Sequence, residues 1–173
     1  MRRLGVIVAL GVMLGMLGGM LTASSALAGR GPKWQFLSAQ PFTLPAEFCG
    51  FKVRVAFPVH KQYIKLVKSS NGTVITLATG AARMSFTNRN TGKTITSNVS
   101  GPGKGTVYPD SSALFALKGH SAAIFPPDLA QRLGLPAVSV TAGALTARFD
   151  PDGNLTSLSL HGHVLLDVCA ALS

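Results

Sequence analysis

Apolar and polar residues alternate along several short segments of the chain, and this alternation predicts β-strands. The clearest example is residues 51–57, where every odd position is Phe or Val and the even positions are Lys, Arg and Ala. Successive side chains of a strand point to opposite faces, so one face of this segment is apolar and the other carries two cations. Pro58 follows directly, and because Pro lacks the backbone N–H that a ladder needs, we expect the strand to end there.

Further segments of the same kind predict that the body of the protein is β-sheet. Turn-forming sequences separate them, among them Asn71-Gly72, a residue pair that two-residue hairpins favour. Short strands joined by short turns are typical of an antiparallel all-β domain, and we expect a barrel or a sandwich of about 8–10 short strands with mostly up-and-down connections. The other predicted strands are 42–44, 62–68, 73–79, 82–87, 94–99, 106–108, 112–118, 121–125, 138–149 and 155–161.

One segment has the start and stop signals of a helix. Residues 128–133 follow two prolines, which suit a first helical turn, and Gly134 and Pro136 supply the usual end signals. Residues 164–172 fit either a strand or a short helix, because periodicity alone does not separate the two. We therefore expect a β domain with one short helix near 128–133.

The N-terminus has the three parts of a secretory signal peptide. Two arginines precede a stretch of apolar residues and glycine at 4–21, and Ala-Leu-Ala ends at Ala28. We expect cleavage after Ala28, with an uncleaved membrane anchor as the alternative, because the apolar stretch is just long enough to span a bilayer. The predicted organisation is a signal peptide at 1–28, a flexible lead-in at 29–40 and one secreted β domain at 41–173, extracellular or associated with the cell envelope.

The chain has two cysteines, and they favour a disulfide. An even pair of cysteines in an exported chain is usually oxidised, and no redox-active C-x-x-C is present. Cys49 stands at the entrance of the 51–57 strand and Cys169 stands close to the last residue. A bond between them would tie the first strands to the C-terminus, while two buried free thiols are the alternative.

The charge balance is strongly basic and favours anionic partners. The formal net charge is +10, and removal of the signal peptide would leave a charge of about +8. If these cations bind a partner, we expect an anionic cell-wall polymer or a membrane surface, and export argues against nucleic acid. A solvated sheet face that discourages edge pairing is the favoured interpretation. The cations that would form an anion-binding stripe are Lys52, Arg54, Lys61, Lys65 and Lys68.

Two segments resemble metal sites but lack ligands. His161 and His163 are two positions apart, hence on one face of a strand, and Asp167 is near them, yet no further ligand cluster follows. Asp150, Asp152 and Asn154 are spaced like the opening of a calcium loop, but the Gly and Glu that such a loop needs later are missing. Solvated histidines and a β-turn account for both segments, and we predict no metal and no cofactor.

The sequence does not favour an enzyme. Residues 119–123 have a similarity to a nucleophile elbow, with His120 before Ser121, but the second Gly and the following helix are absent. Only six acidic residues exist in the chain to orient a base or to form a carboxylate pair. We therefore predict no catalytic residues, with a hydrolase as the least favoured reading.

Four phrases resemble a group of small exported actinobacterial proteins, usually described as hypothetical secreted proteins. The phrases are Phe48-Cys49-Gly50-Phe51 and residues 86–93, 149–155 and 167–172, and the similarity extends over roughly residues 42–173. The resemblance implies a bacterial exported β domain with paired terminal cysteines. It implies no activity and no catalytic residues.

These observations lead to one functional expectation and one main alternative. We expect a monomeric, non-enzymatic interaction protein of the extracellular space or envelope. The alternative is a carrier of a small apolar ligand, since an eight-stranded barrel is able to hold one. A carrier requires an enclosed apolar pocket of several hundred Å³, whereas an interaction protein requires an exposed binding surface.

Overall fold

The computed structural model describes residues 33–68 and 71–173. The predicted signal peptide lies outside the described residues, as do residues 29–32 of the predicted lead-in. The described chain forms one antiparallel β-sheet with a few short helical segments, so the predicted all-β class is confirmed.

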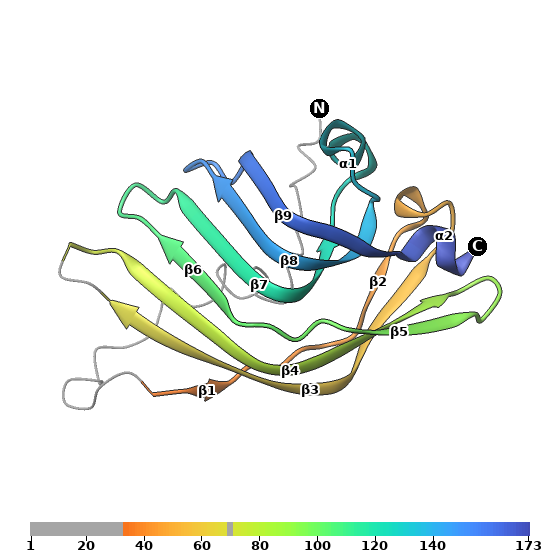
Figure 1. Cartoon of the computed structure of the whole chain (residues 1–173), viewed down its shortest axis with the longest axis horizontal. Helices are drawn as coiled ribbons and strands as arrows, with labels where there is room; N and C mark the ends of the chain where they lie inside the picture. Colours follow the sequence, from red (N-terminus) through yellow and green to blue (C-terminus); the bar gives the residue numbers. More distant parts are fainter. Residues whose placement is uncertain (1–32, 69–70) are drawn as a thin grey trace.

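The strands follow one another along the sheet with few departures from chain order (Figure 1). The order is β1-β3-β4-β6-β7-β8-β9, with β2 also pairing β3 and β5 also pairing β4. Among the described strands β9 does not pair with β1 or β3, so the sheet is not closed into a barrel. The strands are β1 (Gln35–Phe36), β2 (Phe42–Leu44), β3 (Val53–Lys68), β4 (Val74–Asn88), β5 (Thr94–Asn98), β6 (Gly103–Val107), β7 (Ala113–Ile124), β8 (Val138–Phe149) and β9 (Leu155–Asp167).

Pro58 does not end a strand, contrary to the prediction. β3 runs through it for 16 residues, with a register shift against β4 between Ala56 and Val59. On the other side of β3, β2 pairs only with residues 53–55 and β1 only with residues 63–64. Pro58 therefore sits in a β-bulge where no ladder needs its missing N–H, which is one of the places where strands tolerate proline.

A first core fills the space between two layers of strands that do not pair with each other. It joins Val55 of β3 and Phe86 of β4 to Ile124 of β7 and Val140 of β8, each at most 2% exposed. Cys49 and Cys169 pack against its border. At this end the sheet folds over itself like a sandwich, whereas at the other end β6 keeps β4 and β7 in one layer.

A second core lies on the opposite face of β7 and β8, beneath α1 (Pro127–Leu133). Phe125 is fully buried there and neighbours Ile124 of the first core in sequence, so the chain is buried on both faces at this point. Phe115 and Phe149 join the same cluster with an edge-to-face ring contact at 5.7 Å.

A row of glycines crosses the sheet between these two ends. Gly119 pairs with Gly143, and Gly143 pairs with Gly162. The registers on either side place Gly80 of β4 opposite Gly101, which in turn lies beside Gly119. At Gly143 φ is +121°, and an added Cβ would lie 2.7 Å from the Cα of Gly162, so only glycine fits. The long strands β4, β7 and β8 bend near their midpoints, where the row crosses them (Figure 1).

The helices are short and sit at the ends of strands. α1 begins one residue before the predicted 128–133, and Gly134 ends it in the left-handed conformation with φ of 63°. The ambiguous segment 164–172 divides in two: β9 continues to Asp167, whose carboxylate accepts a bond from the N–H of Ala170 at 3.1 Å and so caps α2 (Val168–Leu172). A 3-10 turn, η2 (Ala46–Phe48), precedes Cys49.

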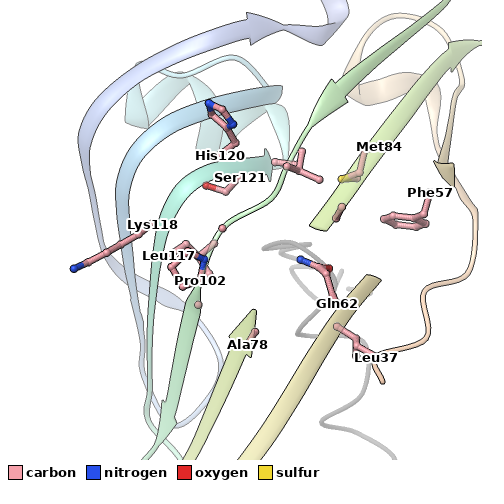
Figure 2. A pocket seen from close by; sticks show the side chains of 15 residues that line it. Leu37, Phe57, Gln62, Ala78, Met84, Pro102, Leu117, Lys118, His120 and Ser121 are labelled. Carbon is pink, nitrogen blue, oxygen red and sulfur yellow. The ribbon is translucent and has the colours of Figure 1, made fainter. Parts of the chain in front are cut away.

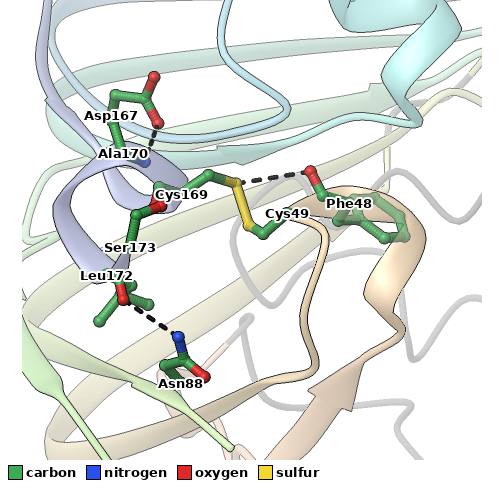
Figure 3. Close-up of a disulfide and its surroundings, with 8 residues drawn as sticks. All are labelled: Phe48, Cys49, Asn88, Asp167, Cys169, Ala170, Leu172 and Ser173. Atoms are coloured by element: carbon green, nitrogen blue, oxygen red, sulfur yellow. Dashed lines mark hydrogen bonds between the residues drawn. A yellow bond between two sulfur atoms is a disulfide. The ribbon is translucent and has the colours of Figure 1, made fainter. Parts of the chain in front are cut away.

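The predicted disulfide joins Cys49 to Cys169 and ties the turn before β3 to α2 (Figure 3). A buried hydrogen bond from Nδ2 of Asn88 to the carbonyl of Leu172, at 3.1 Å, holds the same helix to the end of β4. On the surface, Nζ of Lys93 donates to the carbonyl of Ser173 at 2.9 Å. The C-terminal helix therefore closes the end of the sheet at which the two layers face each other.

The structured body begins earlier than the predicted boundary at residue 41. Gln35 and Phe36 pair with β3, and the N–H of Leu37 donates to the carbonyl of Gln62 at 3.0 Å. Leu37 is only 5% exposed. Residues 35–36 of the predicted lead-in thus form an edge strand, which the sequence did not indicate because two paired residues produce no recognisable alternation.

Candidate functional site: the basic face of the sheet

The cations predicted at 51–68 lie on or beside β3, and the bulge brings most of them to one face. Arg54 is at an even position whereas Lys61 and Lys65 are at odd positions, so regular alternation would place them on opposite faces. The one-residue register shift between Ala56 and Val59 reverses the alternation. Arg54, Lys61 and Lys65 consequently point to the same side of the sheet.

Lys52 and Lys68 stand at the two ends of this segment. Lys52 precedes β3 by one residue and alternates with the buried Val53, so it belongs with Arg54. Lys68 is the last residue of β3 and occupies the opposite alternation to Lys65. Its side chain lies outside the described residues, and we leave Lys68 out of the face described below.

The register of the sheet adds cations from β4 and β6 to the same side. Residues that are Cα partners in an antiparallel pair point to one face. Arg83 is the partner of Val59. Lys104 is the partner of Leu77, which is itself the partner of Lys65. Two strand spacings separate Lys65 from Lys104, a distance of about 10 Å.

β7 and β8 extend the cationic surface further across the sheet. Ala116 is the partner of Lys104, and Lys118 stands two positions beyond it. Leu114, two positions before Ala116, is the partner of Arg148. We call this surface the basic face. Its members are Lys52, Arg54, Lys61, Lys65, Arg83, Lys104, Lys118 and Arg148, all exposed except Lys65, which is half-buried.

The acidic residues form no salt bridge with the basic face within the part of the chain that the structure describes. All six are among the described residues, and they stand in turns, in short helices or at the end of a strand. Asp167 of β9 is the Cα partner of Ser139, which alternates to the side of the sheet opposite the basic face. The carboxylate of Asp167 caps α2. The remaining acids are Glu47 in η2, Asp110 after β6, Asp128 in α1, and Asp150 and Asp152 between β8 and β9.

The basic face is therefore uncompensated within the described chain. The salt bridge found in residues 33–68 and 71–173 joins Arg132 to Asp128 at 3.7 Å, and it lies on α1. Eight like charges on one side of a sheet create a positive potential that attracts anions and weakens as salt rises, with a screening length of about 8 Å at physiological ionic strength. The arrangement suits a partner that carries many spaced negative charges.

A small cleft opens where the two layers separate, next to the glycine row (Figure 2). Phe57, Met84 and Leu117 supply apolar walls, and Leu37 reaches in from the N-terminal edge. Figure 2 shows the side chain of Lys118 pointing away from the cleft. The cavity volume is about 50 Å³, well below the roughly 300–1,000 Å³ of pockets that enclose small organic ligands.

His120 and Ser121 both line this cleft but do not form a nucleophile–base pair. Nδ1 of His120 lies 3.1 Å from Nδ2 of Asn98. The hydroxyl of Ser121 lies 3.2 Å from the hydroxyl of Thr141. Adjacent strand residues point to opposite faces, which is why these two side chains have separate partners.

His161 and His163 lie on the exposed edge strand β9, as predicted from their spacing. Their Cα partners are Ala144 and Ala142, which offer no ligand atoms. Within residues 33–68 and 71–173, no three His, Cys, Asp or Glu side chains gather closely enough to hold a metal ion. His161 belongs to the same side as Lys118, because Ala144 is also the partner of Lys118.

The aspartates at 150–154 form a structural turn. The carboxylate of Asp150 accepts bonds from the backbone N–H of Asn154 at 2.8 Å and from its side-chain amide at 3.0 Å. These hydrogen bonds, the side-chain bond first, hold the pKa of Asp150 below its usual value. The oxygens are thus used within the turn, which joins β8 to β9.

The sequence indicated only part of the basic face. Arg83 was visible in the alternation of 82–87, but Lys104, Lys118 and Arg148 are isolated cations in separate segments. Their common orientation depends on strand register, which a single sequence does not give. A signal was nevertheless present for Arg148, which stands between the buried Ala147 and Phe149.

No protein-family model matches the chain, and no curated protein or solved structure shows significant similarity to it. Among the helices of the described residues, none has the length and apolarity required to cross a membrane.

Proposed function

We propose that this protein is an exported, non-enzymatic interaction domain that binds a phosphate-rich polyanion of the cell envelope through its basic face. The observation that carries the proposal is the placement of eight cations on one side of the sheet, with no salt bridge from them to an acidic residue of the described chain. The disulfide is compatible with an oxidising, extracellular location. The resemblance to exported actinobacterial proteins supports a bacterial envelope as the setting.

Two features favour surface binding over the carrier alternative. The cleft is too small for an apolar ligand of ordinary size. The basic face, in contrast, is broad and exposed and has Ser and Thr side chains between its cations, among them Thr79, Thr146 and Ser159. Such hydroxyls donate hydrogen bonds to phosphate oxygens beside the cations.

Binding to a defined polyanion tests the proposal. The purified protein is titrated with poly(glycerol phosphate), and dextran serves as a neutral polymer control. We expect saturable binding to the polyanion that weakens steeply between low and high salt. The double variant Lys104→Ser/Lys118→Ser should weaken binding about tenfold or more, since each cation near an anionic surface contributes about 1 kcal/mol.

A matched variant distinguishes the loss of cations from the basic face from a mere reduction of the net charge. Lys93→Ser/Arg132→Ser also removes two exposed cations, but from the turn between β4 and β5, where Lys93 donates to the carbonyl of Ser173, and from α1. We expect it to change binding less than about twofold, because these cations lie off the face. Equal losses in the two double variants, or no binding to the polyanion at low salt, would contradict the proposed function.

A further inference from the structure

Three large aromatic side chains are exposed together at the β1 edge of the sheet. Trp34 is 48% exposed, Phe36 is 57% exposed and Tyr63 is 43% exposed. The rings of Phe36 and Tyr63 meet edge to face with centroids 5.8 Å apart. The other exposed large apolar residues of the described chain, Leu66, Tyr108 and Leu165, are scattered over different strands and turns.

This aromatic edge belongs to the basic face. Tyr63 alternates with Lys61 and Lys65 on β3, so the three point to the same side. Phe36 is the Cα partner of Tyr63 and therefore points to the same side, and Trp34 stands two positions before Phe36, directly before β1. Aromatic groups and cations are thus interleaved along one border of the sheet.

The edge is held in place by the residues behind it. The ring of Phe36 also meets that of His60 at 5.6 Å, and His60 meets Phe57 at 5.8 Å. Burial lowers the pKa of His60, which favours the neutral ring in this stack. Leu37 anchors the strand beneath, so little conformational freedom remains to be lost when Phe36 meets a partner.

The combination of exposed aromatic rings and cations distinguishes between two kinds of anionic partner, a soluble polymer and a lipid bilayer. A soluble phosphate polymer satisfies the cations but offers no apolar medium for Phe36. At an anionic bilayer, Trp, Tyr and Phe rings enter the headgroup and upper acyl region while Lys and Arg remain with the lipid phosphates. Exposed apolar area of this kind, rimmed by cations, is typical of a membrane-docking surface.

We propose that Trp34, Phe36 and Tyr63 form an interfacial docking edge that inserts into the surface of an anionic phospholipid bilayer while the neighbouring cations of the basic face bind lipid phosphates. This inference rests on the proposed function and narrows its partner to a membrane. Membrane docking requires a contribution from the aromatic side chains to binding, whereas binding to a soluble polymer does not.

Trp34 makes the test direct because it is the one tryptophan of the chain. Its fluorescence is recorded while the purified protein is titrated with vesicles of phosphatidylcholine containing phosphatidylglycerol, and with phosphatidylcholine vesicles alone. We expect a blue shift with the anionic vesicles. The neutral vesicles control for adsorption through any other apolar part of the chain.

Variants then separate the aromatic edge from the charges. Phe36→Ser/Tyr63→Ser should weaken binding to anionic vesicles about tenfold or more and leave binding to poly(glycerol phosphate) unchanged, because only the bilayer provides an apolar environment. The control Tyr108→Ser/Leu165→Ser, which removes exposed apolar groups elsewhere, should bind vesicles as the wild type does. Far-ultraviolet circular dichroism confirms that each variant is folded.

The outcomes for the two proposals are distinguishable. If Trp34 emission does not shift and the aromatic variant binds vesicles normally, while the Lys104/Lys118 variant still weakens polyanion binding, the docking edge is wrong and the proposed function stands. Failure of the wild-type protein to bind either polyanion or anionic vesicles overturns both. A blue shift that follows protein concentration without vesicles would identify a second copy as the occupant and overturn membrane docking.

Discussion

The two faces of the β3–β4 hairpin are determined by different physical requirements. On the inner face, Val53, Val55 and Phe86 have no exposed surface, and they belong to one core with residues of the distant strands β7 and β8. On the outer face, Arg54, Lys61 and Arg83 have no ion-pair partner within the described residues. Packing therefore accounts for the inner residues, whereas no packing contact or ion pair within the described residues accounts for the cations of the outer face, which are the residues that the proposed function uses.

The largest expected effect comes from the inner face. Phe86→Ala removes a fully buried ring from the first core and should lower the free energy of unfolding by about 3–5 kcal/mol. Urea unfolding followed by circular dichroism measures the change. A loss below about 1 kcal/mol would mean that the two layers are not packed through this residue.

The disulfide should have the next largest effect. Cys49→Ser opens a covalent loop with a sequence separation of 120 and should cost about 2–5 kcal/mol. We expect a lower melting temperature and faster amide exchange in α2, which also depends on Asn88 and Lys93. If the variant and the oxidised wild type melted at the same temperature, the bond would contribute nothing to the closure of this end.

The smallest effect on stability should come from the outer face. Lys104→Ser/Lys118→Ser removes two exposed cations from a face with no acids and should change the free energy of unfolding by less than about 0.5 kcal/mol. At low salt the two substitutions should raise the free energy of unfolding slightly, because repulsion between like charges is relieved. A destabilisation above about 2 kcal/mol would show that these lysines are structural, which would remove the contrast between the two faces.

The sequence predicted the local features of this fold and missed those that depend on register. Alternation at 51–57 correctly placed Val53 and Val55 in a core, and the turn residues marked most strand ends. Pro58 was misread because a bulge was not considered, and the same bulge decides that Arg54 and Lys61 share a face. The sequence did not decide between a barrel and a sandwich, since the closure of β4 over β7 is set by tertiary packing rather than by any local pattern.

The candidate site was predicted in the same partial way. Lys52, Arg54, Lys61 and Lys65 were found because they are close in sequence, whereas Lys104, Lys118 and Arg148 come together only through the pairing of β6, β7 and β8. The aromatic edge was not foreseen, because Phe36 and Trp34 occur in a segment without periodicity. Only the strand pairing of Phe36 with Tyr63 reveals that this segment lies beside the cations of β3.

The glycine row has a consequence for how the strands find their partners. Hydrophobic alternation disfavours a slip of one residue, because such a slip exchanges the two faces of a strand, but it tolerates a slip of two. A slip of two residues between β8 and β9 would move Gly162 away from Gly143 and bring a side chain against backbone that now accommodates only hydrogen atoms. The row therefore excludes the misaligned sheets that the apolar pattern permits, and it fixes the single register in which the cations of separate strands become neighbours.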